Sequence, residues 1–249
     1  MFNIFKRKPK LPDYSFLGVD LHSHLLPGID DGARSIGHSI ALIEMLQKLG
    51  FHTLITTPHV MAEMYTNDIP TIKAKHQEVL AALKEKEIDI ELHAAAEYLM
   101  DEGFGAKADN RELLTLPGNR VLVEMSFFAP PPMLEDYLFR LQTRGYHPLL
   151  AHPERYLFLK GDLRKYRELK DRGCEFQLNL LSLGGYYGKP TRENAYELLN
   201  AGLIDFLATD LHHEGQAERL QEMRWDKTLA KALRKKEFKN AELAALPMV

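Results

Sequence analysis

The chain contains very little cysteine: Cys174 is the only one in 249 residues. One cysteine cannot form an intramolecular disulfide, and such low usage is typical of proteins in a reducing compartment. A phosphatase with a cysteine nucleophile needs an arginine six residues after the cysteine, and that position here is Leu180. Cys174 also opens a predicted buried strand, so we interpret it as a core residue. These observations predict a cytoplasmic protein and exclude thiolate-based phosphatase chemistry.

The sequence also lacks a long apolar run and a strong excess of charge of either sign. No segment is long enough to span a bilayer, and the net charge of −3 offers no basic field for nucleic acid. The one basic cluster near the start is formed by Lys6, Arg7, Lys8 and Lys10. We expect it to belong to a solvated N-terminal arm, residues 1–15, with contact to a membrane surface as the alternative. We therefore predict neither a nucleic-acid partner nor stable membrane insertion.

The rest of the chain alternates β-rich runs with amphipathic helical patterns. The predicted strands cover residues 16–24, 51–57, 88–96, 120–125, 146–151, 175–180 and 204–208. The predicted helices cover residues 35–49, 69–86, 134–144, 163–172 and 192–201, with one or two more within 218–239. This order predicts an α/β fold with a parallel sheet and right-handed crossovers. Seven units in series favour a (β/α)7 TIM-like barrel over residues 16–235, rather than an open doubly wound sheet, with residues 236–249 as a C-terminal tail.

Histidines and acidic residues stand at or just after the ends of six of the predicted strands. Because the carboxyl ends of parallel strands share one rim of a barrel, these side chains would converge there. Imidazole and carboxylate groups are ligands for divalent cations. The candidate ligands are His22, His24, Asp31, His59, Glu97, Glu124, His152, Asp210 and His212. They exceed what one ion needs, so we predict a centre of two or three ions.

The spacing of the candidate ligands supports this prediction. His22 and His24 are two residues apart in an extended segment and therefore point to the same side, and Asp210 and His212 repeat that geometry. Glu124 lies in an otherwise apolar strand, where an unpaired carboxylate would be costly. Structural histidines, or an arginine partner for Glu124, would explain any one of these features alone, but the combination predicts a metal centre. The other histidines, which we expect to be structural or to point away from the rim, are His38, His52, His76, His93, His147 and His213.

Five motifs resemble those of the polymerase-and-histidinol-phosphatase (PHP) superfamily. They are DLHSHLLPGIDDGA (Asp20–Ala33), TTPH (Thr56–His59), AAAEY (Ala94–Tyr98), HPERY (His152–Tyr156) and TDLH (Thr209–His212). The chain looks most like the capsular-polysaccharide branch, the manganese-dependent bacterial tyrosine phosphatases that oppose a cytoplasmic tyrosine kinase. One departure is the residue after His212, which is often Asn in this branch and is His213 here.

The resemblance implies a distorted barrel and specific ligand sets. It implies one ion held by His22, His24, Glu97 and Asp210, a second by Glu97, Glu124 and His152, and a third by Asp31, His59 and His212. Mn²⁺ is the expected metal, with Fe or Zn as alternatives because the same ligand types accept them. The implied substrate is phosphotyrosine on a protein, such as the tyrosine kinase of capsule or exopolysaccharide synthesis.

The expected nucleophile is a metal-bound water molecule, whose pKa the ions lower. Arg155 is the candidate phosphate clamp, because a guanidinium group matches two phosphate oxygens. An exposed loop position or a salt bridge to Glu154 is the alternative for this arginine. Tyr186 and Tyr187, in the Gly- and Tyr-rich segment 178–190, are candidates for stacking on the substrate ring, although an ordinary loop has the same composition.

The metal-ligand pattern together with the family resemblance thus predicts a metal-dependent protein-tyrosine phosphatase. One alternative is a phosphatase for a small metabolite, such as a histidinol phosphatase. A second alternative is a metal-stabilised regulator without turnover, which the large ligand set disfavours because structural sites are usually closed around one ion.

Overall fold

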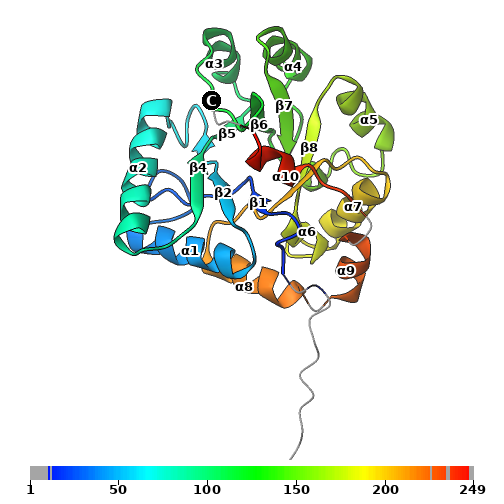
Figure 1. The fold of residues 1–249 in the computed structure, drawn as a ribbon. Helices are drawn as coiled ribbons and strands as arrows, with labels where there is room; N and C mark the ends of the chain where they lie inside the picture. Colours follow the sequence, from blue (N-terminus) through cyan, green and yellow to red (C-terminus); the bar gives the residue numbers. More distant parts are fainter. Residues whose placement is uncertain (1–10, 12, 225, 234–235, 247–249) are drawn as a thin grey trace, which may run out of the picture.

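The computed structural model describes residues 11, 13–224, 226–233 and 236–246, and its strands lie in the middle of a ring of helices (Figure 1). The strands are β1 Val19–Asp20, β2 Thr53–Thr56, β3 His59–Val60, β4 Glu91–Ala94, β5 Glu97–Leu99, β6 Arg120–Glu124, β7 His147–Ala151, β8 Glu175–Asn179 and β9 Phe206–Ala208. Every neighbouring pair of strands is parallel. The predicted α/β fold with parallel strands is therefore confirmed.

The helices begin and end close to where the sequence pattern predicts them. They are α1 Ile36–Lys48, α2 Ile69–Glu85, α3 Phe104–Asn110, α4 Leu134–Thr143, α5 Leu163–Asp171, α6 Leu180–Leu183, α7 Lys189–Asn200, α8 Glu214–Met223, α9 Lys227–Leu233 and α10 Asn240–Ala244, with the 3-10 turn η1 at Pro153–Arg155. Local caps explain two of these boundaries: the Ser35 hydroxyl accepts a hydrogen bond from the His38 backbone N–H, and the Asp68 carboxylate accepts one from Thr71. The short helices α3, α6 and α10 were not predicted.

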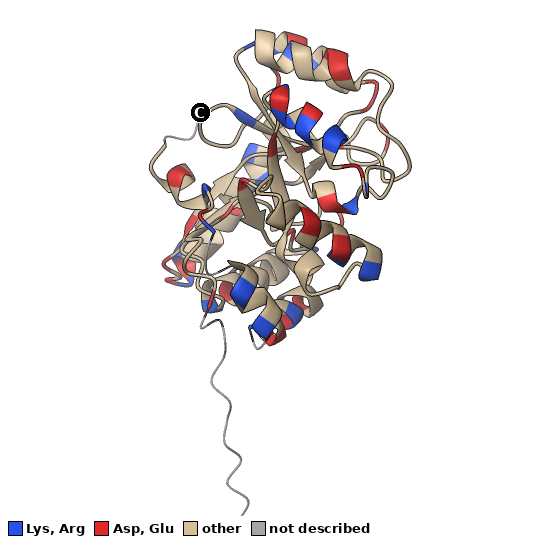
Figure 2. Ribbon diagram, turned by 90° about the vertical axis from the view of Figure 1, so that its right-hand side faces the viewer, with Lys and Arg blue, Asp and Glu red and all other residues tan. Residues whose placement is uncertain are grey.

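Acidic and basic residues are mixed over the outer helices (Figure 2). This distribution agrees with the near-neutral net charge of the sequence. Among the helices of the described residues, none combines the length and the apolar character needed to cross a bilayer. The basic cluster of the predicted N-terminal arm lies outside the described residues.

The prediction of seven continuous strands is wrong in number, because the described residues contain nine strands in two sheets. The sheet orders are β1-β2-β4 and β3-β5-β6-β7-β8-β9. β2 lies within the second predicted strand and β4 within the third, and the two additional strands follow just beyond the predicted ends: β3 after Pro58, which has no N–H to donate, and β5 after Ala95 and Ala96. Backbone hydrogen bonds continue the pairing beyond β2 and β4, from Ala95 N–H to Thr56 O at 2.9 Å and from Glu97 N–H to Pro58 O at 3.1 Å.

A closed barrel is not confirmed in the described part of the chain. After β1 the chain approaches the end of β9 through an isolated parallel bridge between Ser23 and Leu211. Two backbone bonds accompany it, from His24 N–H to Leu211 O at 2.9 Å and from Asp210 N–H to His22 O at 2.8 Å. These bonds bring the ends of the first and last strand segments together, and so place the residues of two distant motifs side by side.

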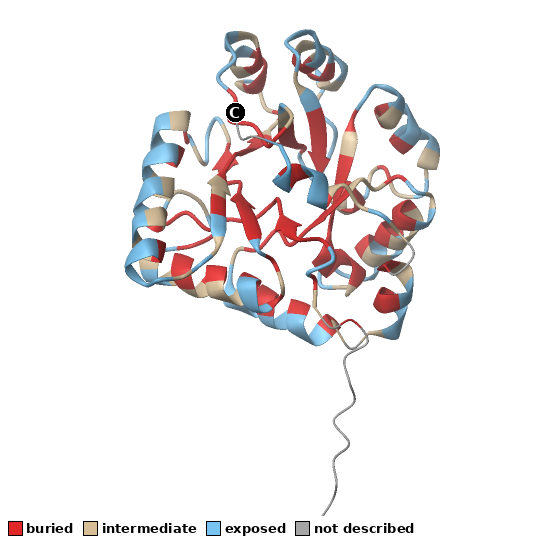
Figure 3. Cartoon of the chain, viewed as in Figure 1, coloured by how far each residue is buried: buried red, intermediate tan, exposed pale blue. Residues whose placement is uncertain are grey.

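The apolar core has an inner and an outer part. The outer part lies between strands and helices, and in Figure 3 the strands are buried while the helices expose their outer faces. The inner cluster consists of Val19, Leu21, Ile55, Ala95, Leu116, Leu122, Leu149, Ala151, Phe206, Ala208 and Leu243. Most of its members come from strands, and Leu243 belongs to α10, which contacts β1. Part of the predicted C-terminal tail thus packs on the strands, while the division into arm, domain and tail stays a prediction.

Asn240, at the start of α10, ties this helix to the strands. Its buried side chain accepts a hydrogen bond from Leu207 N–H at 3.1 Å and donates to Val19 O at 2.9 Å and Leu207 O at 2.7 Å. We expect Asn240→Ala to lower the free energy of unfolding by about 2 kcal/mol, because it leaves buried backbone groups of two strands without partners. Urea denaturation measures this change, and Glu242→Ala, on the exposed side of the same helix, is the control. Equal stability of the two variants would contradict the assigned role.

Candidate metal centre

The loop after β1 folds back on His24 and carries two acidic residues to it. Ala33 N–H donates to His24 O at 3.0 Å, and Gly28 N–H donates to Ala33 O at 2.8 Å. A Cβ atom at Gly32 would lie 2.2 Å from the His24 carbonyl oxygen, so only glycine permits this close approach. The glycine therefore explains how Asp30 and Asp31 reach the histidines of the preceding segment.

One group of four side chains surrounds a common point at the ends of the strands. The His22 Nε2 atom lies 3.0 Å from Glu97 Oε2 and 3.3 Å from Asp210 Oδ1. The His24 Nε2 atom lies 3.4 Å from His22 Nε2, 3.6 Å from Glu97 Oε2 and 3.5 Å from Asp210 Oδ1. All four side chains are almost completely buried.

These separations fit the coordination of one divalent ion. Ligand atoms about 2.1 Å from an ion are about 3.0 Å apart at octahedral angles and about 3.4 Å apart at tetrahedral angles. The observed separations between His22, His24, Glu97 and Asp210 run from 3.0 to 3.6 Å. The donor set is imidazole and carboxylate without sulfur, which suits manganese, iron or zinc.

Glu97 also faces a second group of side chains. Its Oε1 atom lies 3.1 Å from His152 Nε2, and its Oε2 atom lies 3.2 Å from His59 Nδ1. Glu124 Oε1 is 3.2 Å from the same His59 nitrogen, whereas Glu124 Oε2 is 3.9 Å from His152 Nε2. The side chains expected around the second ion, Glu97, Glu124 and His152, therefore lie close together. His59 lies closer to Glu124 than His152 does.

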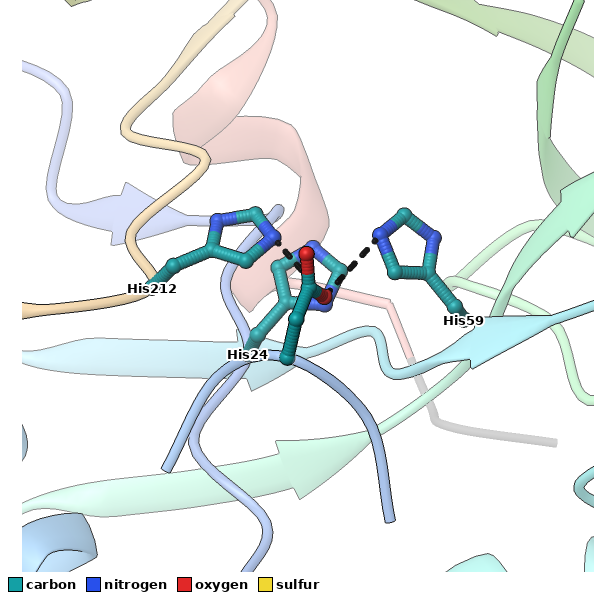
Figure 4. A group of neighbouring side chains, drawn as sticks. His24, His59 and His212 are labelled. Carbon is teal, nitrogen blue, oxygen red and sulfur yellow. Dashed lines mark ion pairs between the residues drawn. The ribbon is translucent and has the colours of Figure 1, made fainter. Parts of the chain in front are cut away.

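The third group gathers around Asp31 at the mouth of the site. Asp31 Oδ1 is 3.5 Å from both His59 Nε2 and His212 Nε2. Figure 4 shows His24, His59 and His212 arranged around this carboxylate, and the His24 and His212 rings stack with centroids 3.8 Å apart. His59 thus presents one ring nitrogen to this group and the other to the second group. All nine predicted ligands lie within one continuous cluster.

Two further observations point to cations in this cluster. His59 Nδ1 and Glu124 Oε1 are buried, and neither makes a hydrogen bond within the described residues. Burial lowers the pKa of His22, but the carboxylates of Glu97 and Asp210 outweigh this effect and raise it to about 10. Burial likewise lowers the pKa of His59, which Glu97 and Glu124 raise to about 10. The concentrated carboxylates thus favour positive charge, and an ion would coordinate these two buried atoms, which make no hydrogen bond among the described residues.

The histidines are oriented by residues that the sequence analysis did not identify. His22 Nδ1 lies 2.8 Å from Gln177 Oε1, and His24 Nδ1 lies 2.8 Å from Asp30 Oδ2. With the proton on Nδ1, each ring donates to that oxygen and turns its Nε2 atom toward the cluster. Asn179, two residues after Gln177, donates to Asp210 Oδ2 at 2.6 Å. A sequence signal for Gln177 and Asn179 did exist: they are two polar residues, two positions apart, between apolar neighbours in one strand. This spacing places both side chains on one face of the strand.

Two candidate ligands have an unusual backbone conformation. His152 has a φ of 36° and Asp210 has a φ of 53°, in the left-handed region that favours glycine. Each lies just after the end of a strand, β7 and β9 respectively. Strained backbone of this kind persists where the surrounding structure imposes it, and it is concentrated at functional sites.

A cavity of about 400 Å³ opens beside the cluster, and Arg155 lines it. Arg155 Nη1 donates to Asp210 Oδ2 at 3.1 Å, while its Cζ atom lies 4.4 Å from the ring centres of both Phe127 and Tyr187. The alternative salt bridge from Arg155 to Glu154 is not formed: the buried Glu154 carboxylate accepts hydrogen bonds from Ser182 and a backbone N–H. The arginine is therefore held at the cavity wall, within reach of a ligand of the cluster.

The two predicted substrate-contact tyrosines differ in position. Tyr187 lines the cavity, whereas the Tyr186 hydroxyl lies 3.4 Å from His213 Nε2. His213 itself lines the cavity, contrary to the expectation that it points away. The partners of three other histidines agree with their structural interpretation: His38 pairs with Glu214, His76 with Leu92 O and His93 with Glu91.

Comparison with known proteins places this site in a family. The family model described as capsular polysaccharide synthesis, CpsB/CapC, matches residues 18–241. The chain belongs to the CpsB/CapC family. The matched range includes all nine candidate ligands and Arg155, and it confirms the resemblance to the capsular-polysaccharide branch.

Two relatives in this family are named tyrosine-protein phosphatases. YwqE of Bacillus subtilis strain 168 is 29% identical over 196 residues, which cover 78% of this chain and 77% of the relative. CpsB of Streptococcus pneumoniae is 28% identical over 201 residues, covering 78% of this chain and 83% of the relative. A crystal structure from work on YwqE and CpsB as unique metal-dependent tyrosine phosphatases has a TM-score of 0.74 to this structure at 26% identity, covering 88% of this chain and 96% of that chain.

The contact between His24 and Asp30 generates a prediction about metal affinity. We expect Asp30→Ala to weaken Mn²⁺ binding roughly 10- to 100-fold, because the His24 ring loses the acceptor that fixes its orientation. Calorimetric titration with Mn²⁺ measures the affinity. Asp89→Ala removes an exposed acid elsewhere and is the matched control. An Asp30→Ala variant that is folded and binds Mn²⁺ as tightly as the control would count against this role.

Proposed function

We propose that this chain is a metal-dependent phosphatase that hydrolyses phosphotyrosine on proteins. The observation that carries the proposal is the buried Glu97 carboxylate, which lies 3.0 to 3.2 Å from nitrogens of three histidines beside an arginine-lined cavity. The names of the family relatives supply the substrate class. Small-metabolite phosphatase activity and a regulator without turnover are the alternatives that the experiments below separate from it.

We assign the nine side chains to three adjoining ions, of which the first two share Glu97. His22, His24, Glu97 and Asp210 would hold the first, Glu97, Glu124 and His152 the second, and Asp31, His59 and His212 the third. Their spacing in the site supports this assignment, and Mn²⁺ is the ion we propose. When bound, the ions would make a water molecule nucleophilic at neutral pH and neutralise charge on the phosphate.

The side chains of the chain itself bind and orient the phosphate. Arg155 can leave Asp210 for two phosphate oxygens, because a guanidinium group binds both in a bidentate arrangement. Three divalent ions would bring six positive charges, of which the carboxylates of Asp31, Glu97, Glu124 and Asp210 would cancel four. The remaining positive charge, together with the arginine, favours a dianionic phosphate in the cavity. A phenolate leaving group has a pKa of about 10, so its departure needs little protonation.

The proposed substrate is a phosphotyrosine protein such as a tyrosine kinase of capsule or exopolysaccharide synthesis. The family description supports the link to capsular polysaccharide. The location proposed for this reaction is the cytoplasm, in line with the single cysteine of the chain.

Hydrolysis of a tyrosine-phosphorylated peptide by the manganese-loaded protein tests the function. We expect chelation of the metal and His22→Ala each to abolish the release of phosphate, because both remove the cation that His22 would bind. Cys174→Ala is the control and keeps full activity, since the Cys174 side chain is buried and its pKa is raised to about 12 by that burial. Faster turnover of histidinol phosphate than of the peptide would favour the metabolite phosphatase, and metal binding without any turnover would favour the regulator.

The position of Arg155 predicts that this residue binds the phosphate group of the substrate during the reaction. We expect Arg155→Ala to lower kcat/KM for a phosphotyrosine peptide about 100-fold, because a preorganised cation at the phosphate oxygens is removed. Arg155→Lys restores little of this loss, since an ammonium group cannot bind two oxygens in a bidentate arrangement. Arg164→Ala, whose side chain is 77% exposed on α5, is the control. Wild-type kinetics in Arg155→Lys would rule out the bidentate contact.

A further inference from the structure

Phe127 is an exposed aromatic side chain at the edge of the candidate metal centre. It lies three residues after Glu124 and lines the same cavity as Arg155, although 44% of its surface is exposed. Aromatic side chains that line a ligand cavity commonly contact the bound ligand. The other lining residues are charged side chains and histidines together with Met61, Met64, Tyr65, Tyr187 and Gln216.

The position of the Phe127 ring is fixed by its neighbours. Its centroid lies 4.4 Å from Arg155 Cζ, 5.7 Å from the His152 ring and 5.8 Å from the Tyr156 ring. Tyr156 is fully buried, and its hydroxyl oxygen accepts a hydrogen bond from the Met125 backbone N–H at 3.0 Å. Phe127 is therefore in contact with both a candidate metal ligand and the candidate phosphate clamp, while part of its ring remains open to the cavity.

We propose that Phe127 is a specificity-determining residue that selects aryl over alkyl phosphates. This inference rests on the proposed function. A phosphate bound between the ion cluster and Arg155 must direct its ester group toward the open cavity, and in phosphotyrosine the aromatic ring follows immediately after the ester oxygen. The exposed part of the Phe127 ring offers that substrate ring an offset or edge-to-face contact, which an alkyl ester cannot make.

The two tyrosines expected from the sequence are less suited to this role. The Tyr187 ring contacts the Arg155 guanidinium group at 4.4 Å, and the Tyr186 ring lies against Tyr187 with centroids 5.1 Å apart. Tyr187 therefore packs on the arginine, and Tyr186 packs on Tyr187. Phe127 is the aromatic side chain that adjoins His152 as well as Arg155.

Binding of two non-hydrolysable phosphonates tests the inference. We expect the manganese-loaded wild-type protein to bind phenylphosphonate roughly 3- to 10-fold more tightly than methylphosphonate, the range of one aromatic contact. Phe127→Ala and Phe127→Leu should both lose this preference, since neither retains the ring. Phe128→Ala is the matched control, because Phe128 is the neighbouring phenylalanine, is 94% exposed and does not line the cavity. Isothermal titration calorimetry gives the four pairs of dissociation constants.

Several outcomes would overturn the inference. If the wild-type protein binds both phosphonates equally, or binds neither, the Phe127 ring does not select aryl ligands and the inference is wrong. Phe127 variants that lose affinity equally for both ligands would show that the ring only supports Arg155. Turnover of phosphotyrosine and phosphoserine peptides by the same proteins keeps the two proposals apart: a wild-type preference for phenylphosphonate without hydrolysis of phosphotyrosine contradicts the proposed function and leaves the inference standing.

Discussion

The burial of the Glu97 carboxylate is the constraint on which the site depends. Glu97 has no exposed surface, and a carboxylate in such surroundings is stable only when opposite charge and hydrogen-bond donors surround it. His22, His59 and His152 lie within 3.0 to 3.2 Å of its two oxygens. Burial by itself raises the pKa of Glu97, but these histidines lower it well below its ordinary value. The Glu97 carboxylate thus forms ion pairs with histidines from three separate segments of the chain.

The backbone that delivers these side chains is arranged by parallel pairing. The register pairs His59 with Glu97 on neighbouring strands β3 and β5, and the bridge between Ser23 and Leu211 brings the first segment to the last. The interruptions after β2 and β4 start new strands at His59 and Glu97 themselves. The departures from a regular barrel therefore occur where candidate ligands stand, which is where irregular backbone can aim side chains inward.

Much of the fold follows from local patterns. The helices α1, α2, α4 and α5 agree closely with the predicted ranges because apolar periodicity and end signals such as Ser35 and Asp68 act within a few residues. The number of strands and the packing of α10 on β1 depend on hydrogen bonds between distant segments, such as those of Asn240. Local propensity carries no information about such partners, so these features were missed.

The sequence by itself determined which residues have the chemistry for a metal centre and, through parallel topology, that they would meet at one end of the strands. It did so because ligand type and strand-end position are local properties. Only the tertiary structure decided which atoms approach one another: that His59 faces both Glu124 and Asp31, that Gln177 and Asp30 orient the histidines, and that Phe127 stands beside Arg155. These distances arise from packing among segments far apart in the chain, which no short-range pattern specifies.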